Sequence, residues 1–132
     1  MQLLTLTLLG IPFIVILDLL WLGVIAKDFY RAQLGSLMTD SIVWGAAILF
    51  YVLYAFGLAL FVIQPNLALG MGKVVLMGAV FGFIAYAVYD LTNLATLKDW
   101  PLTMTIVDMI WGAFLTACVS GAVYFIATKV LV

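Results

Sequence analysis

Four long apolar stretches dominate the chain, and each is about as long as a bilayer is thick. A membrane-spanning helix takes about 20 mostly apolar residues, and the stretches cover about residues 3–26, 41–63, 73–97 and 102–131. The runs are continuously apolar, whereas the strands of a membrane barrel alternate over about ten residues. The pattern predicts an all-α integral membrane protein, with four transmembrane helices in an antiparallel bundle that forms one domain over residues 1–132.

The segments between the stretches are short and contain turn-forming or polar residues. Asp40 and Ser41 are expected to cap the second helix, and Pro101 is expected at the first helical position of the fourth. Residues 27–40 mix charged residues with aromatic ones such as Tyr30. This mixture suits a short interfacial helix with its aromatics at the headgroup level, and a plain loop is the alternative.

Composition excludes the other broad classes of protein. Hydrophobic residues make up 68% of the chain and charged residues 8%, against about 25% charged residues in a soluble domain. We therefore expect a lipid bilayer as the main partner and no nucleic acid, whose binding needs a basic stripe. Lys27, Arg31 and Lys98 outnumber the two basic residues at the other end of the bundle, which places loops 27–40 and 98–101 in the cytoplasm.

All six acidic residues are Asp, and Asp18, Asp90 and Asp108 fall inside the spans. Each lies six to eight residues from the same end of the bundle, a depth of about 9–12 Å at 1.5 Å per residue. A charged Asp near the bilayer centre costs about 2.5–3.5 kcal/mol, so these groups need water, protons or partners. We predict that they form one buried cluster that titrates as a coupled set and holds a shared proton or a small cation.

Two further patterns extend this candidate site. On the third helix, polar residues share the face of Asp90 and the opposite face is apolar; these polar residues are Tyr89, Asn93 and Thr96. The spacing Asp18-x-x-Trp21 recurs as Asp108-x-x-Trp111, and a carboxylate beside an indole face can hold an organic cation. The alternative is structural, with each Asp accepting a hydrogen bond from a group on another helix. The sequence assigns no catalytic residue and no cofactor, and it does not decide whether the acids bind a metal ion.

Three runs resemble a known family. They are YDLTNLATLKDWP from Tyr89 to Pro101, DLLWLG from Asp18 to Gly23, and DMIWG from Asp108 to Gly112. Together they resemble the signature of a family of small predicted bacterial membrane proteins, catalogued as domain of unknown function 2177, and the resemblance covers nearly the whole chain. It implies a multi-pass, four-helix protein of the inner (cytoplasmic) membrane, and it implies no established activity.

Three functions remain open at this point. The buried acids favour a small proton- or cation-coupled transporter or permease, for which we expect a homodimer because four helices give little room for alternating access. A structural or accessory subunit of a larger membrane complex is the alternative, with the Asp–Trp pairs as packing contacts. A lipid-modifying membrane enzyme is the third reading. The chain has no His and no Glu, which counts against an enzyme.

Overall fold

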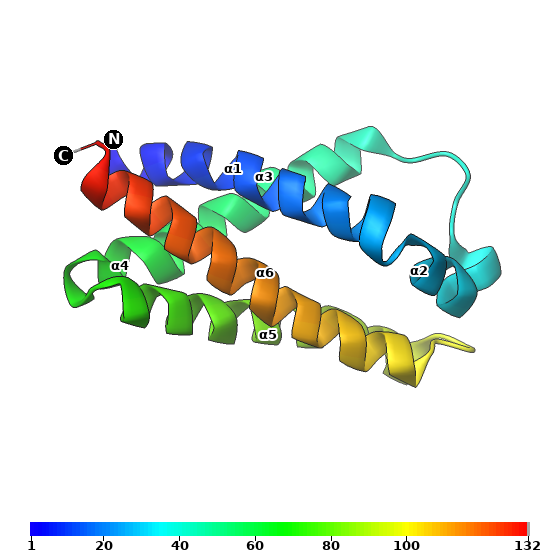
Figure 1. Cartoon of the computed structure of the whole chain (residues 1–132). Helices are drawn as coiled ribbons and strands as arrows, with labels where there is room; N and C mark the ends of the chain where they lie inside the picture. Colours follow the sequence, from blue (N-terminus) through cyan, green and yellow to red (C-terminus); the bar gives the residue numbers. More distant parts are fainter. Residues whose placement is uncertain (132) are drawn as a thin grey trace.

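The structure, a computed structural model, describes residues 1–131 and forms an all-helical bundle. The helices are α1 (Gln2–Leu20), α2 (Lys27–Leu34), α3 (Trp44–Leu58), α4 (Gln64–Asn66), α5 (Met71–Thr96) and α6 (Leu102–Lys129). The chain contains no strand within residues 1–131. The two chain ends lie at one end of the bundle, and α2 lies at the other (Figure 1).

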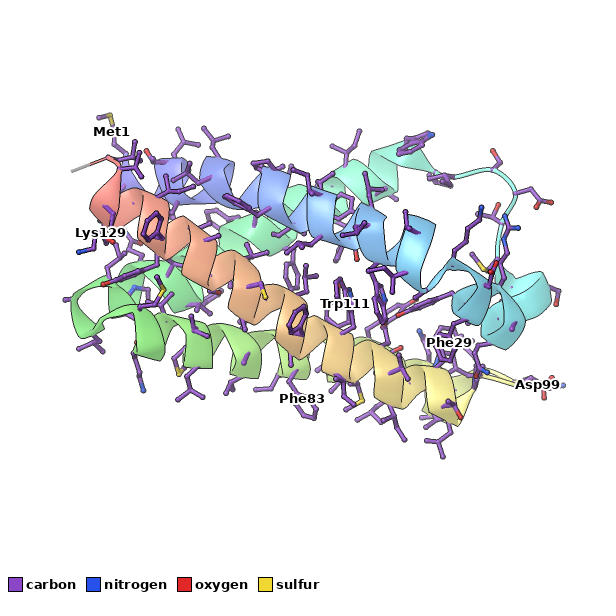
Figure 2. The ribbon with its side chains drawn as sticks, in the orientation of Figure 1. Met1, Phe29, Phe83, Asp99, Trp111 and Lys129 are labelled. Carbon is purple, nitrogen blue, oxygen red and sulfur yellow. The ribbon has the colours of Figure 1, made fainter. Side chains whose placement is uncertain are left out.

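Four helical segments are long and apolar enough to cross a membrane, as the hydrophobic pattern predicted. They are Gln2–Ile25, Trp44–Leu69, Met71–Thr96 and Leu102–Lys129. The first and second extend beyond α1 and α3 through π-helical turns, Trp21–Ile25 and Ala59–Ile63. Side chains such as Phe83 point out of the bundle, while Trp111 points inward (Figure 2). The outward face is the one that lipid would cover.

The helix starts differ from the expected ones. Val43 occupies the N-cap of α3 and no side chain caps that helix, so the capping role expected of Asp40 and Ser41 was wrong. The Ser41 backbone N–H instead donates to the Thr39 hydroxyl at 3.1 Å, so this part of the loop forms its own local turn. Pro101 is the N-cap of α6 and not its first helical residue, because its backbone is extended (ψ 130°) while its carbonyl accepts from the Thr105 N–H.

The segment between the first two spans contains a helix and not only a loop. α2 runs over Lys27–Leu34 and is followed by a single 3₁₀ turn, Gly35–Leu37. Its buried residue is Tyr30, which packs with Ala26 and with Met104 of α6. α2 therefore attaches to the end of the bundle through the face that carries Tyr30.

Packing between α5 and α6 is the closest contact in the bundle. A Cβ added to Gly82 would overlap the Thr116 side chain and the Gly112 carbonyl, and one added to Gly112 would overlap the Tyr86 ring. A Cβ added to Gly78 would come within 2.9 Å of the Thr116 carbonyl oxygen. Small residues allow helix backbones to approach in this way, and in a membrane such packing drives association. The two helices are therefore fixed in one register.

This register determines which residues lie opposite each other. Gly82 lies against Thr116, and Tyr86, one turn further along α5, lies against Gly112. The helices are antiparallel, so a step of four residues forward along α5 corresponds to a step of four residues back along α6. The next step therefore brings Asp90 of α5 to the level of Asp108 of α6. The glycine contacts thus place two acidic residues of the candidate site opposite each other.

Gly82→Ala should destabilise the protein by about 1–3 kcal/mol, because the added methyl group has no space between α5 and α6. Gly72→Ala on the same helix is the matched control, since a Cβ there meets nothing within 4 Å. Unfolding of the purified protein in detergent, followed by circular dichroism, measures the difference. Equal stability of the two variants would contradict the close packing.

Candidate functional site

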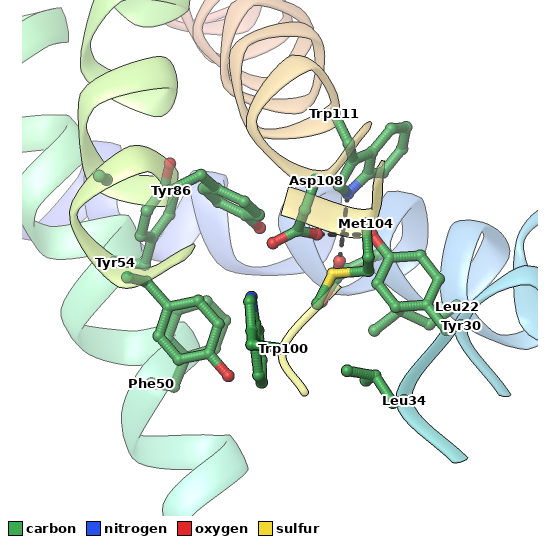
Figure 3. A pocket seen from close by; sticks show the side chains of 13 residues that line it. Leu22, Tyr30, Leu34, Phe50, Tyr54, Tyr86, Trp100, Met104, Asp108 and Trp111 are labelled. Carbon is green, nitrogen blue, oxygen red and sulfur yellow. Dashed lines mark hydrogen bonds between the residues drawn. The ribbon is translucent and has the colours of Figure 1, made fainter. Parts of the chain in front are cut away.

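A cavity of about 480 Å³ lies at the α2 end of the bundle. Its wall combines residues from α1 and its π-helical turn, α2, α3, α5, α6 and the loop before α6 (Figure 3). The apolar and aromatic members are Leu22, Tyr30, Leu34, Phe50, Tyr54, Ala85, Tyr86, Tyr89, Trp100, Met104 and Trp111. The two acidic members are Asp18 and Asp108. The cavity is therefore an aromatic chamber with two carboxyl groups in its wall.

Asp18 is buried near the end of α1 and connects three helices. The Tyr51 hydroxyl of α3 donates to its Oδ2 at 2.7 Å, and the Trp111 Nε1–H of α6 donates to its Oδ1 at 3.5 Å. The Asp18 side chain is 6% exposed. Both of its oxygens thus have a partner, as a buried carboxylate requires.

Trp21 lies three residues after Asp18, at the start of a π-helical turn. The Ala26 N–H donates to the Trp21 carbonyl five residues earlier, at 2.7 Å, and this wider turn rotates the residues that follow it. The Trp21 ring stacks on Trp111, with 4.4 Å between centroids and 7° between planes. The two Asp-x-x-Trp repeats therefore meet crosswise, because Trp111 of the second repeat bonds Asp18 of the first.

Asp108 is buried on α6 and accepts a hydrogen bond from α2. The Tyr30 hydroxyl donates to its Oδ1 at 2.5 Å and itself accepts from the Trp21 Nε1–H at 3.1 Å. Burial, and then the hydrogen bond to Asp108, raise the pKa of Tyr30 well above the ordinary tyrosine value. Tyr30 therefore remains a neutral donor, and it connects the helix outside the spans to a carboxyl inside them.

Asp90 differs from the other two acids. It is wholly buried (0% exposed), and within residues 1–131 neither of its carboxyl oxygens has a hydrogen-bond partner. The acidic group that faces it is Asp108. All five basic side chains of the chain are exposed, so none is buried beside these carboxyls. Asp90 is thus a buried polar group that the described residues leave unsatisfied.

The other expected site residues separate into two groups. Tyr89 lines the cavity with 59% of its surface exposed, and its ring meets Trp100 edge to face at 6.1 Å. Asn93 is half-buried and does not line the cavity. Thr96 is exposed, and its hydroxyl donates to the Thr92 carbonyl of its own helix at 2.8 Å. Its place on the polar face of α5 does not bring it to the acids, because it lies at the last turn of the helix.

Some residues of the site were not among the expected ones. Tyr30 and Tyr51 supply the hydroxyls that bond the acids, and Tyr54 bonds Thr116 of α6 at 2.7 Å. The sequence signal for them was indirect, since a buried carboxylate needs a donor and tyrosine is the commonest polar aromatic near the spans. For a metal ion, no group of three acidic or cysteine side chains within the described residues is suitably placed.

Tyr30→Phe should destabilise the protein by about 1.5–3 kcal/mol at pH 8, because Asp108 loses a donor and the Trp21 N–H loses an acceptor. The raised pKa of Tyr30 means that its contribution is complete below pH 10 and is lost as the pH rises further. The wild-type advantage should therefore shrink above pH 10. Chemical unfolding in detergent at several pH values tests this expectation, with Tyr124→Phe as the control. Equal stability of wild type and Tyr30→Phe at pH 8 would contradict it.

Comparisons with known proteins agree with this architecture. The model of one protein family, described as “Predicted membrane protein (DUF2177)”, matches residues 3–125. Neither the curated proteins nor the solved structures gave a match to the chain. The matched region includes nearly all of the four spans, together with Asp18, Asp90 and Asp108. The chain therefore belongs to the DUF2177 family of membrane proteins.

Proposed function

We propose that the chain is a small proton-coupled membrane transporter. The observation that carries this proposal is Asp90, a wholly buried carboxyl that has no hydrogen-bond donor among residues 1–131 and that faces Asp108, a residue of the cavity wall. Ionisable residues inside membrane spans are rare and often mark proton or substrate pathways. A transporter needs such a group next to a chamber that a solute can enter.

Electrostatics favours one proton on the pair formed by Asp90 and Asp108. Two unit charges about 4 Å apart repel by about 4 kcal/mol at an effective dielectric constant of about 20, and no basic side chain is buried beside these two. A single proton removes the repulsion and supplies the missing donor, because a carboxylic acid can donate to a carboxylate. The pair can therefore hold one shared proton.

Asp108 would couple this proton to the cavity. It faces Asp90 on one side and accepts from Tyr30 of α2 on the other. Proton gain or loss on the pair changes the strength of the Tyr30 hydrogen bond, since bonds to an ionised acceptor are roughly twice as strong as neutral ones. Because Tyr30 and Leu34 of α2 line the cavity, this change would alter how firmly α2 covers it. Two copies of the chain would form the transport unit, because residues 1–131 of one copy supply four spans, which leave little room for alternating access.

A role as a structural subunit has one observation in its favour. Both oxygens of Asp18 have donors on other helices, which is the arrangement of an acid that serves as a packing contact. In this reading the Asp–Tyr and Asp–Trp bonds fix the helices, and the chain acts by assembling with a larger complex. Asp90 has no such partner in the part of the chain that the structure describes, so the transporter explains more of the site.

Asp90→Asn should abolish pH-gradient-driven flux, because the amide cannot take up and release the shared proton. The purified chain is reconstituted in liposomes with an entrapped pH-sensitive dye, and Na⁺, K⁺ or small organic cations are added. In parallel, infrared spectroscopy should show a protonated-carboxyl band at neutral pH in wild type that is lost in the variant. Asp40→Asn, in an exposed loop, should retain both the flux and the band.

The same experiment separates the two functions. A folded Asp90→Asn protein without flux supports the transporter. A wild-type infrared spectrum that shows ionised carboxylates and no protonated-carboxyl band would rule out the shared proton. Wild-type liposomes without flux for any added ion, together with reduced assembly of the Asp18→Asn variant into a larger complex, would favour the structural subunit.

The α2 end of the protein is expected to face the cytoplasm, because Lys27, Arg31 and Lys98 lie there. In a Cys118→Ala background, Ser36→Cys near α2 should react with a membrane-impermeant thiol reagent only in inverted vesicles. Ala68→Cys, at the opposite end, should react only from the outside of intact cells. Both positions are exposed. Labelling of each position from both sides would show that the chain inserts in two orientations, contrary to this expectation.

A further inference from the structure

We propose that the cavity at the α2 end binds a small organic cation with an aromatic or alkyl body, and that this is the transported substrate class. That the cation is transported rests on the proposed function, whereas its binding rests on the cavity alone. It concerns the chamber lined by Asp18, Asp108 and a ring of aromatic side chains (Figure 3).

The size of the cavity suits an organic molecule. Its volume is about 480 Å³, within the range of about 300–1,000 Å³ typical of small-molecule sites. Hard inorganic cations require several oxygen ligands around one point. No three acidic or cysteine side chains of residues 1–131 meet in that way, and most of the wall is carbon. A large, mostly apolar chamber favours an organic body over a bare metal ion.

The charge of the wall selects for a cation. Asp18 and Asp108 line the chamber, and none of the described lining residues is basic. One oxygen of Asp108 accepts from Tyr30, while the other points away from that hydroxyl (Figure 3). Within a membrane these carboxylates act through a low dielectric, where a positive ligand is strongly favoured and an anion is repelled.

Aromatic side chains form the rest of the cation's surroundings. Trp111 is held in place by stacking on Trp21 at 4.4 Å, and Tyr54 meets Tyr86 edge to face at 6.2 Å. Trp100 closes one side from the loop before α6, and its Nε1–H donates to Thr105 at 3.1 Å. Aromatic faces attract quaternary ammonium groups, by about 0.5–1 kcal/mol each or more when water is excluded.

Binding can be measured without a gradient, with benzyltrimethylammonium as the probe. Equilibrium dialysis of the full chain in lipid nanodiscs, with empty nanodiscs subtracted, should show saturable binding of this cation. Neopentylbenzene, its uncharged isostere, and benzenesulfonate, an aromatic anion, should compete at least about tenfold more weakly. Asp108→Asn should weaken cation binding about tenfold or more, and Asp40→Asn should leave it unchanged.

Matched tryptophan variants test the aromatic wall. Trp100→Leu should weaken binding by about two- to fivefold, the loss expected for one cation–π contact. Trp44→Leu should have no effect, because Trp44 is 63% exposed at the start of α3 and lies outside the cavity. Near-ultraviolet circular dichroism checks that each variant is folded. If Asp108→Asn does not fold, Asp18→Asn is measured in its place.

Each outcome has a separate meaning. Selective cation binding that falls in Asp108→Asn and Trp100→Leu supports the site. Equal affinity for the uncharged isostere, or for benzenesulfonate, overturns it. Binding without any proton-coupled flux would overturn the transporter and leave the cation site standing. Flux of another ion without cation binding would overturn the substrate class and leave the transporter standing.

Discussion

The close approach of α5 and α6 is the constraint on which the rest of the structure depends. Gly82 and Gly112 have no side chain of their own at this contact, and an added Cβ at either position would overlap a group of the other helix. Inside a membrane, lipid tails remove most of the hydrophobic drive for helix association, so packing of small residues decides which helices meet and in what register. In this chain the register brings Asp90 to the level of Asp108, and this placement creates the most unusual feature of the molecule.

Hydroxyl and indole donors then stabilise the remaining acids. Tyr51 and Trp111 bond Asp18, and Tyr30 bonds Asp108. These bonds join α1, α2, α3 and α6, so the same contacts that satisfy the carboxylates also hold the bundle together. Buried polar groups normally have partners because an unpaired one costs about 1–3 kcal/mol. Asp90 is the exception within the described chain, and a group that stability alone does not explain is a reasonable candidate for function.

Asp108 connects the two halves of the functional proposal. It belongs to the acidic pair that would carry a proton, and it also lines the chamber that would hold an organic cation. A proton and a cation at one carboxylate compete for the same negative charge, which is the simplest physical basis for exchange of one for the other. Tyr30 extends this connection to α2, the helix that covers the chamber from outside the spans.

The sequence by itself determined the four spans, because each helix satisfies its own backbone in lipid and needs only a sufficient apolar length. It also identified Asp18, Asp90 and Asp108, because acids in such stretches are costly wherever they point. Only the tertiary structure decided which donors reach them. A helical wheel assigns a residue to a face, but it gives neither the rotation of that face nor the neighbour it meets. The crosswise pairing of Asp18 with Trp111 depends on contact between helices that are far apart in the sequence, and so does the hydrogen bond from Tyr30 to Asp108.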